Sequence, residues 1–185
     1  SRSNFIDHIM TFVQDYDLDG VELDWEYPTV DSQSYYEALV VELSARLDEE
    51  NKELSAALNG AWSSTEGPEV SKLVTPQCLE AFSFINVMCY DTNNADHSPL
   101  WFTDTSISYW LNRGMKPEQI VVGIPLYARP SWAQYRHLVA ADSNNAYRDF
   151  AAANEKITLD SYYNGLNTIT EKTAIALRRA GGVML

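Results

Sequence analysis

The sequence is short of several features that mark particular classes of protein. It holds two cysteines among 185 residues, Cys78 and Cys89, which is too few for a disulfide framework. No apolar run approaches the roughly 18 residues that span a bilayer. We therefore expect both thiols to be free, with Cys89 buried in an apolar segment, and we expect no membrane as a partner.

Positive charge is also scarce. There are 13 Lys and Arg against 26 Asp and Glu, so the formal net charge is -13 at pH 7. This excess repels nucleic-acid phosphates and anionic lipid headgroups, so we expect neither nucleic acid nor a membrane surface as a partner. A neutral or cationic substrate fits better. The hydrophobic fraction of 45% is enough for one globular core and excludes intrinsic disorder as the main state.

The hydrophobic pattern alternates between helical and strand-like segments. Helices are predicted over 5–16, from a cap at Asp31 or Ser32 to 47, and over 69–82, 104–114 and 168–179, and strands over 20–26, 54–58, 84–90, 119–124 and from 183. Residues 91–103 are expected to form a polar loop, and 133–160 a loop with a short helix. This alternation, without repeats or linkers, favours one α/β domain, or part of one, built on a parallel sheet.

The strand predicted over 20–26 is the most informative stretch, because apolar and acidic residues alternate in it. One face carries Val21, Leu23 and Trp25, and the other carries Glu22, Asp24 and Glu26. Alternate residues of a strand lie about 6.6 Å apart, so the three carboxyls form a column and cannot all ionise cheaply. Repulsion and burial are expected to raise at least one pKa, which keeps a proton available for general acid catalysis.

Glu26 is the candidate proton donor, because the carboxyl end of a strand is where a parallel barrel opens to its substrate. Two other interpretations of the acidic face stay open. It could be a solvent-facing edge, or Asp19, Glu22, Asp24 and Glu26 could supply oxygen ligands to Mg²⁺ or Ca²⁺. The three histidines stand in unrelated contexts, and we expect no metal and no organic cofactor.

The segment Asp19-Gly20-Val21-Glu22-Leu23-Asp24-Trp25-Glu26-Tyr27-Pro28 resembles the catalytic signature of glycoside hydrolase family 18, the chitinases. That signature is Asp-x-x-Asp-x-Asp-x-Glu followed by Tyr-Pro, and Glu22 departs from it by one methylene. Other segments resemble family motifs in the family's order: Met88-Cys89-Tyr90-Asp91, Ser98-Pro99-Leu100, Gly123-Ile124-Pro125-Leu126-Tyr127-Ala128-Arg129 with Ala128 in place of a glycine, and Gly181-Gly182-Val183-Met184.

The resemblance implies a (β/α)8 TIM barrel, of which this chain would supply the fourth to eighth strands, about five βα units. A TIM barrel typically needs about 250 residues. The N-terminus, Ser1-Arg2-Ser3-Asn4, has neither an initiator Met nor a signal-peptide core. We therefore expect residues 1–185 to be one partial catalytic barrel that lacks the first three βα units and the end of the last strand.

The activity implied by the resemblance is retaining, substrate-assisted hydrolysis of chitin, the β-1,4-linked polymer of N-acetylglucosamine, through an oxazolinium intermediate. Glu26 would protonate the leaving oxygen and then act as base toward water. Asp24 would orient the acetamido N–H, and Glu22 would share a proton with Asp24. From the facing strand, Tyr90 would hydrogen-bond the acetamido oxygen.

The resemblance also implies a set of substrate-binding side chains and a partner, chitin or a chitooligosaccharide. The expected binding residues are Tyr27, Met88, Asp91, Trp101, Tyr127, Arg129 and Trp132. Trp25 and Trp62 are expected to pack against helices instead. Two alternatives stay open: a catalytically weak, lectin-like chitin binder, or an endo-N-acetylglucosaminidase acting on glycans or peptidoglycan. Secretion is expected from the family alone.

Overall fold

A parallel five-stranded sheet forms the centre of the computed structural model, which describes residues 1–93 and 95–185. Its strands lie in the order β1 (Gly20–Leu23), β2 (Glu53–Asn59), β3 (Phe84–Met88), β4 (Ile120–Gly123) and β8 (Gly182–Met184). The register pairs Gly20 with Glu53, Ser55 with Phe84, Ile85 with Ile120 and Val121 with Gly182. The predicted parallel α/β architecture is confirmed, with the first strand three residues shorter than expected.

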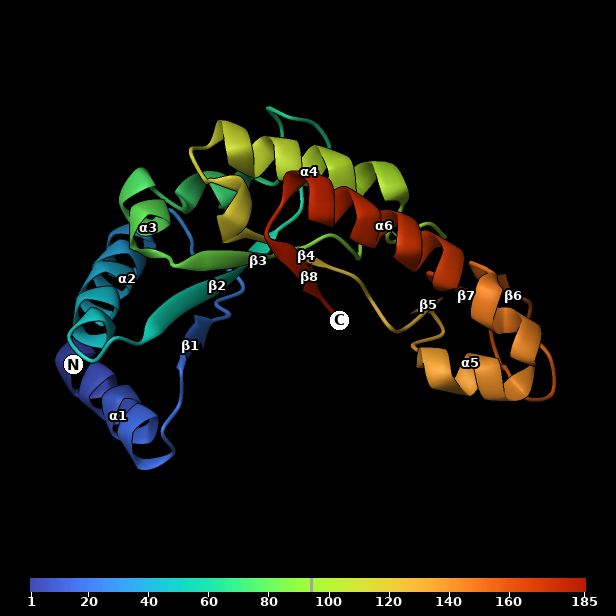
Figure 1. Cartoon of the computed structure of the whole chain (residues 1–185), viewed down its shortest axis with the longest axis horizontal. Helices are drawn as coiled ribbons and strands as arrows, with labels where there is room; N and C mark the ends of the chain where they lie inside the picture. Colours follow the sequence, from blue (N-terminus) through green and yellow to red (C-terminus); the bar gives the residue numbers. More distant parts are fainter. Residues whose placement is uncertain (94) are drawn as a thin grey trace.

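Helices line the convex side of this sheet in an arc (Figure 1). They are α1 (Arg2–Asp15), α2 (Gln33–Asp48), α3 (Pro76–Ala81), α4 (Leu100–Asn112) and α6 (Leu166–Arg179), with the short 3-10 helices η1 (Glu69–Leu73) and η2 (Pro117–Gln119). Ser32 precedes α2, as predicted. Each predicted helix is present, but two of the predictions need correction.

The corrections have local causes. The helix predicted over 69–82 is two short helices, because Thr75 caps a new one, its hydroxyl accepting from the Cys78 N–H. The polar loop predicted over 91–103 is shorter than expected, since α4 begins directly after Pro99 and not at Asp104. Asn94, in that predicted loop, lies outside the described residues.

The main core lies between the sheet and the helices. Strand residues such as Leu54, Ala56, Ile85 and Val87 are buried against the helices, and burial of this kind contributes about 25 cal/mol per Å² of apolar surface. Cys78 and Cys89 are both buried and free, which confirms the expectation that they form no bridge. Among the helices of the described residues, none is long and apolar enough to cross a membrane.

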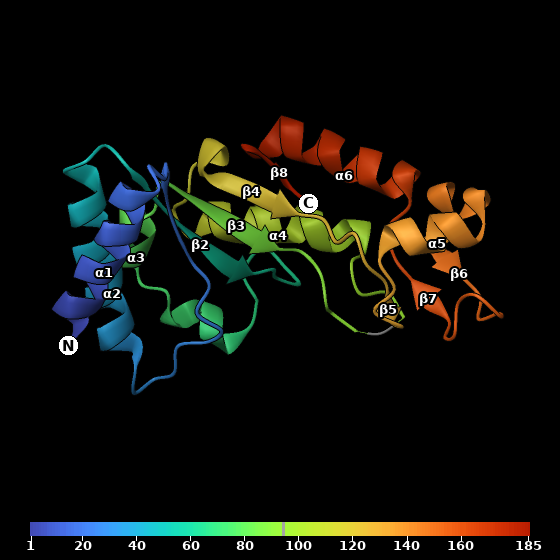
Figure 2. The ribbon, with the colours of Figure 1, turned by 90° about the horizontal axis from the view of Figure 1, so that it is seen from below.

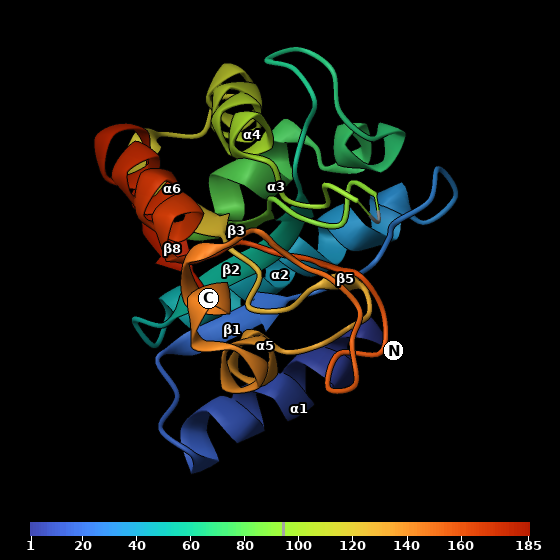
Figure 3. The ribbon, with the colours of Figure 1, turned by 90° about the vertical axis from the view of Figure 1, so that its right-hand side faces the viewer.

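A second, smaller sheet is inserted between β4 and α6. Its antiparallel strands β5 (Arg129–Pro130), β7 (Ser161–Tyr162) and β6 (Phe150–Ala151) lie beside α5 (Tyr135–Ala141) and η3 (Ser143–Tyr147). The sequence predicted only the short helix of this region. Figures 2 and 3 show the inserted sheet beyond the carboxyl ends of the central strands. It therefore lies at the end of the sheet where a barrel carries its active site.

Candidate active site

The acidic segment leaves the sheet before its last two carboxyls. β1 ends at Leu23, and Asp24 and Glu26 lie exposed beyond it. Glu22, still in the strand, points across the sheet: its Oε2 accepts a 2.9 Å hydrogen bond from Ser55 Oγ and another from Asn86 Nδ2. The column predicted from an ideal strand is thus divided, with Glu22 held by the neighbouring strands and two carboxyls at the open end.

A cavity of about 400 Å³ lies at the carboxyl ends of β1, β2 and β3. Six of its lining residues are among the predicted site residues: Asp24, Glu26, Tyr27, Met88, Tyr90 and Asp91. The others are Asn59, Gly60, Trp62, Pro68, Thr92 and Phe102. Residues more than 60 positions apart in the chain therefore meet at one end of the sheet, as expected for adjacent parallel strands.

The electrostatics of this cavity centre on Asp24. Burial raises the pKa of its carboxyl, and repulsion from Glu26, a hydrogen bond with Glu26 and repulsion from Glu22 raise it further. The sequence prediction that at least one pKa of the acidic face is raised is confirmed. The partner differs from the expectation, because the carboxyl that hydrogen-bonds Asp24 is that of Glu26 and not of Glu22.

Asp91 forms a second group of polar contacts at the same cavity. Its carboxylate accepts a 2.9 Å hydrogen bond from Tyr127 Oη and one of 3.3 Å from Arg129 Nη1, and His97 Nδ1 lies 3.3 Å from its Oδ1. Asp91 has a φ of 62°, a left-handed conformation that Asp tolerates better than most residues. The structure thus brings together three predicted residues and adds His97, which the sequence did not predict for the site.

His97 is fully buried beneath Tyr127, with the two ring centroids 5.3 Å apart. Burial lowers the pKa of its imidazole, while the nearby Asp91 charge opposes that shift. Its burial and its contact with Tyr127 therefore indicate a structural role for His97. Among the described residues, no group of three or more His, Cys, Asp or Glu side chains is arranged to hold a metal ion.

Tyr90 stands between the acidic cavity and a second one. Its ring meets Tyr127 edge-on at 6.2 Å, and burial, followed by the Asp91 charge, raises its pKa to about 12. The second cavity, of about 790 Å³, lies between Tyr90, the segment Ile124–Tyr127, residues 134–136 and the end of β8. A methyl group on Gly123 would lie 2.8 Å from Tyr90 Cε1, so that glycine makes room for the tyrosine ring.

The tryptophans are distributed differently from the prediction. Trp132 is 61% exposed, stacks on Tyr127 and lies under the Arg129 guanidinium. Trp101 is exposed on the first turn of α4 but does not line the acidic cavity. Trp25 packs edge-on against Tyr36 of α2, as predicted. The packing role predicted for Trp62 is wrong, since it is 51% exposed and lines the cavity.

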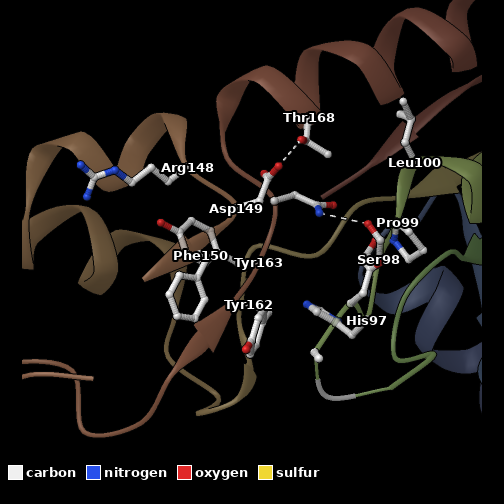
Figure 4. A pocket seen from close by; sticks show the side chains of 13 residues that line it. His97, Ser98, Pro99, Leu100, Arg148, Asp149, Phe150, Tyr162, Tyr163 and Thr168 are labelled. Carbon is white, nitrogen blue, oxygen red and sulfur yellow. Dashed lines mark hydrogen bonds between the residues drawn. The ribbon is translucent and has the colours of Figure 1, made fainter. Parts of the chain in front are cut away.

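A third cavity, of about 700 Å³, separates residues 95–100 from the inserted sheet. Figure 4 shows His97 and Tyr162 facing each other across it, with Asp149 and Thr168 at its rim. The Asp149 carboxylate is already engaged, accepting 2.7 Å hydrogen bonds from the Gly165 N–H and the Thr168 hydroxyl. Within the described part of the chain, both ring nitrogens of His97 are buried and have no hydrogen-bond partner. Of these polar groups, the Asp149 carboxylate is therefore held by contacts within the protein.

Besides His97, three polar residues of the strands near the site were missed from the sequence. Ser55 and Asn86 hold Glu22, and Asn59 lines the acidic cavity. Each is a polar residue within or at the end of an otherwise apolar strand. Because buried polar groups need partners, that pattern could have identified them.

Comparison with known proteins places this geometry in context. The sequence matches the family described as Glycosyl hydrolases family 18 over residues 1–179. It is 34% identical over 156 residues to a probable endochitinase of Caenorhabditis elegans, and the match covers 70% of this chain and 24% of that protein. It is 30% identical over 155 residues to probable chitinase 10 of Drosophila melanogaster, covering 70% of this chain and 7% of that protein.

Solved structures give the same result for the fold. The GH18 chitinase ChiB from the chitin utilization locus of Flavobacterium johnsoniae has a TM-score of 0.81 and 29% identity, and the match covers 99% of this chain and 58% of that one. A GH18 chitinase mutant of Cycas revoluta in complex with (GlcNAc)4 has a TM-score of 0.79 at 21% identity, covering 98% of this chain and 67% of that one. The predicted fold class, a partial (β/α)8 barrel, is confirmed.

Proposed function

The chain belongs to the glycosyl hydrolases of family 18, and from that premise we propose that it hydrolyses chitin and chitooligosaccharides with retention of configuration. The observation that carries the proposal is the acidic cavity, which Asp24 and Glu26 line from the end of β1 and Tyr90 and Asp91 from the end of β3, with β2 between the two strands. The net charge of -13 suits a neutral polysaccharide. The proposal concerns a chain that spans 24% of the Caenorhabditis relative and 58% of the Flavobacterium structure.

The first proposed step is cleavage of the glycosidic bond. Glu26, in its protonated form, gives its proton to the bridging oxygen as the bond from that oxygen to the anomeric carbon breaks. The carbonyl oxygen of the substrate's own acetamido group forms the new bond to the anomeric carbon, which gives an oxazolinium ion. In the second step the Glu26 carboxylate takes a proton from water, the water oxygen bonds the anomeric carbon, and the ring of the oxazolinium reopens.

Asp24 and Tyr90 are proposed to hold the acetamido group for that attack. Asp24 would accept the acetamido N–H and stabilise the positive charge that develops. The raised pKa of Asp24 and its hydrogen bond with Glu26 support a coupled pair that can exchange one proton. Tyr90 would donate to the acetamido oxygen, and its pKa of about 12 keeps the phenol protonated for that purpose.

The remaining residues are proposed to bind the sugar. Tyr27 and Met88 line the acidic cavity, and Asp91 would accept from sugar hydroxyls while Tyr127 and Arg129 hold it. Trp132 offers an exposed ring for stacking on a pyranose. Trp62 joins this set from the structure. Trp101 would serve only a part of the substrate that extends beyond the cavity.

We also propose that residues 1–185 are one partial catalytic barrel, completed by three further βα units. Within the described part of the chain, β1 and β8 are each paired on one side only, and an unpaired strand edge invites another strand. The concave side of the sheet in Figure 1 has no helix over it, as in a barrel. The family also suggests an extracellular setting, which we keep as part of this proposal.

The test compares the wild type with Glu26→Gln in the full-length protein that contains this chain. The substrate is (GlcNAc)4, with and without EDTA. Loss of general acid catalysis costs about 10²–10⁴ in rate, so the variant should be at least about a hundredfold slower than wild type. Glu118→Gln is the matched control, because Glu118 is exposed in η2, before the amino end of β4, and it should keep wild-type activity.

The other outcomes separate the alternatives. Binding of (GlcNAc)4 by the wild type without cleavage would favour the lectin-like interpretation. Cleavage of glycoprotein glycans or peptidoglycan in place of (GlcNAc)4 would favour an endo-N-acetylglucosaminidase. Loss of activity in EDTA would favour the interpretation in which the acidic residues bind a metal ion. Any of these results would contradict the proposed function.

A further inference from the structure

A fully buried lysine lies outside the candidate active site. Lys172, in α6, is 0% exposed. Its Nζ donates hydrogen bonds of 2.6 Å to Ser98 O, 2.6 Å to Ser98 Oγ and 2.7 Å to Asn164 Oδ1. All three acceptors are uncharged, so the contact is not an ion pair. An ammonium has three N–H donors, and this site has one acceptor for each.

The lysine contacts lead directly to the residues that form the acidic cavity. Ser98 Oγ donates a 2.7 Å hydrogen bond to Cys89 O. Cys89 immediately precedes Tyr90 and Asp91. Asn164 Nδ2 donates to Ser98 O at 3.0 Å, as the dashed line in Figure 4 shows. The Thr92 N–H donates to His97 O at 3.1 Å. Ser98 therefore links two parts of the fold: it bonds Cys89, just after β3, and it accepts from the buried Lys172 ammonium of α6.

The energetics indicate that this arrangement specifies one geometry. Burying an ammonium costs several kcal/mol even after relaxation, and an apolar side chain of similar length would fill the space without that cost. A fully satisfied polar network, in contrast, accepts only one arrangement of its members. The network around Lys172 includes both the main chain before Tyr90 and the residue after His97.

We propose that Lys172 is a positioning residue for the candidate active site: by fixing Ser98, it holds Cys89 and so keeps Tyr90 and Asp91 in their places. This inference rests on the proposed function. Lys172 does not touch the cavity, and it would act through Ser98 alone. Displacement of a catalytic group by about 1 Å from a distant change can cost about a hundredfold in rate.

The network also makes the role of Lys172 depend on pH. Burial lowers its pKa to about 8, against the opposing effects of Cys89, Asp149 and Asp96. The ammonium with its three donors is present below that value, and above it the neutral amine has two donors for three acceptors. Of the other groups that face Lys172, Cys89 has a pKa raised to about 11 and His97 has a lowered pKa, so neither gains or loses a proton near pH 8.

The experiment measures kcat and KM on (GlcNAc)4 from pH 5 to 10 for the wild type, Lys172→Met and Ser98→Ala, in the full-length protein. We expect Lys172→Met to lower kcat between about tenfold and a hundredfold, with KM changed less than about threefold. The wild-type kcat should fall as the pH rises through about 8, and the variant should lack that step. Lys72→Met, an exposed lysine paired with Glu69, is the matched control.

Ser98→Ala keeps the buried lysine and removes only the hydroxyl that joins it to Cys89. It should lower kcat in the same direction, and it decides the question if Lys172→Met does not fold, as judged by circular dichroism. Folded variants with wild-type kcat and an unchanged step near pH 8 would overturn this inference while leaving the proposed function intact. An inactive wild type would overturn the proposed function, whatever the lysine variants do.

Discussion

Two carboxyl groups of the same cavity have opposite surroundings. Asp24 lies beside two other acids, Glu26 and Glu22, and its pKa is raised. Asp91 lies beside the Tyr127 hydroxyl, the Arg129 guanidinium and the His97 ring. The surroundings of Asp24 favour retention of a proton, whereas Asp91 accepts hydrogen bonds from two side chains that hold it in place. The same cavity thus has one carboxyl suited to proton transfer, Asp24, and another, Asp91, that positions its wall.

The two groups also differ in how the chain assembles them. Asp24 and Glu26 are two positions apart, so a short segment is enough to bring them together. The hydrogen-bond partners of Asp91 lie 36 and 38 positions further along the chain, after β4 and at the start of the inserted sheet. The first group is a property of one strand end, and the second depends on the whole fold.

The largest effect predicted by this comparison is for Asp91→Ala. It removes the acceptor for Tyr127 and Arg129 and leaves the wall of the cavity without its central contact. We expect kcat/KM on (GlcNAc)4 to fall about a hundredfold, as for loss of one electrostatic contact in an active site. Asp91→Asn is the matched control, since its amide oxygen can still accept from Tyr127, and its loss should be smaller. Wild-type activity in both variants would show that the contacts of Asp91 with Tyr127 and Arg129 are not needed.

Gly123→Ala should disturb the tyrosine between the two groups. The new methyl would lie 2.8 Å from Tyr90 Cε1 and 2.8 Å from Val87 O, so both the tyrosine ring and the main chain at Val87 must shift. We expect kcat to fall about tenfold, since small misplacements of a reacting group are costly. Gly182→Ala is the control, as nothing lies within 4 Å of a methyl placed there. Similar kcat values for both variants would mean that the position of Tyr90 does not matter.

The same difference, between contacts within one segment and contacts between distant segments, explains which features could be predicted from the sequence. The alternation over residues 20–26 was enough to predict the acidic strand, and the helices and parallel strands followed from periodicity. The ideal strand geometry failed after Leu23, because the chain leaves the sheet there. Glu22, still in the strand, contacts Ser55 of β2 and Asn86 of β3, and no local pattern specifies those partners.

The inserted sheet was the least predictable region. Its strands are two residues long, too short for an alternation to be visible. His97 and Lys172 were not predicted either, because the ring of His97 packs on Tyr127 and Lys172 donates to Ser98, contacts that only the folded chain brings together. Trp62 was assigned to packing, yet its position after β2 exposes it in the cavity. Contacts within one element could therefore be predicted from the sequence, whereas contacts between distant elements could not.

Glu22→Asp tests the part of the acidic group that is held by neighbouring strands. The shorter side chain cannot keep both the Ser55 and the Asn86 contacts, and an unsatisfied buried amide costs about 1–3 kcal/mol. We expect a lower melting temperature and a loss of activity of only a few-fold, because Glu22 does not line the cavity. Ser55→Ala removes one of the same contacts and is the comparison. Higher activity in Glu22→Asp would show that the longer side chain handicaps the site.

The smallest predicted effect is on the stability of the protein, through the ionisation of Asp24. A raised pKa means that folded Asp24 binds its proton more tightly than the unfolded chain does, so its contribution to stability is lost as the pH rises from the model-peptide value of about 3.9 through the folded value. Asp24→Asn removes that loss. Because the side chain is exposed, the gain at neutral pH should be less than about 1 kcal/mol.

Melting temperatures of the wild type and Asp24→Asn, measured from pH 3 to 7, check this sign. The variant should gain on the wild type as the pH rises and then keep a constant advantage above the folded pKa. Asp15→Asn, at an exposed position at the end of α1, is the control and should show no such rise. A difference that shrinks with rising pH would mean that folding stabilises Asp24 as a carboxylate, and the raised pKa on which the comparison depends would not hold.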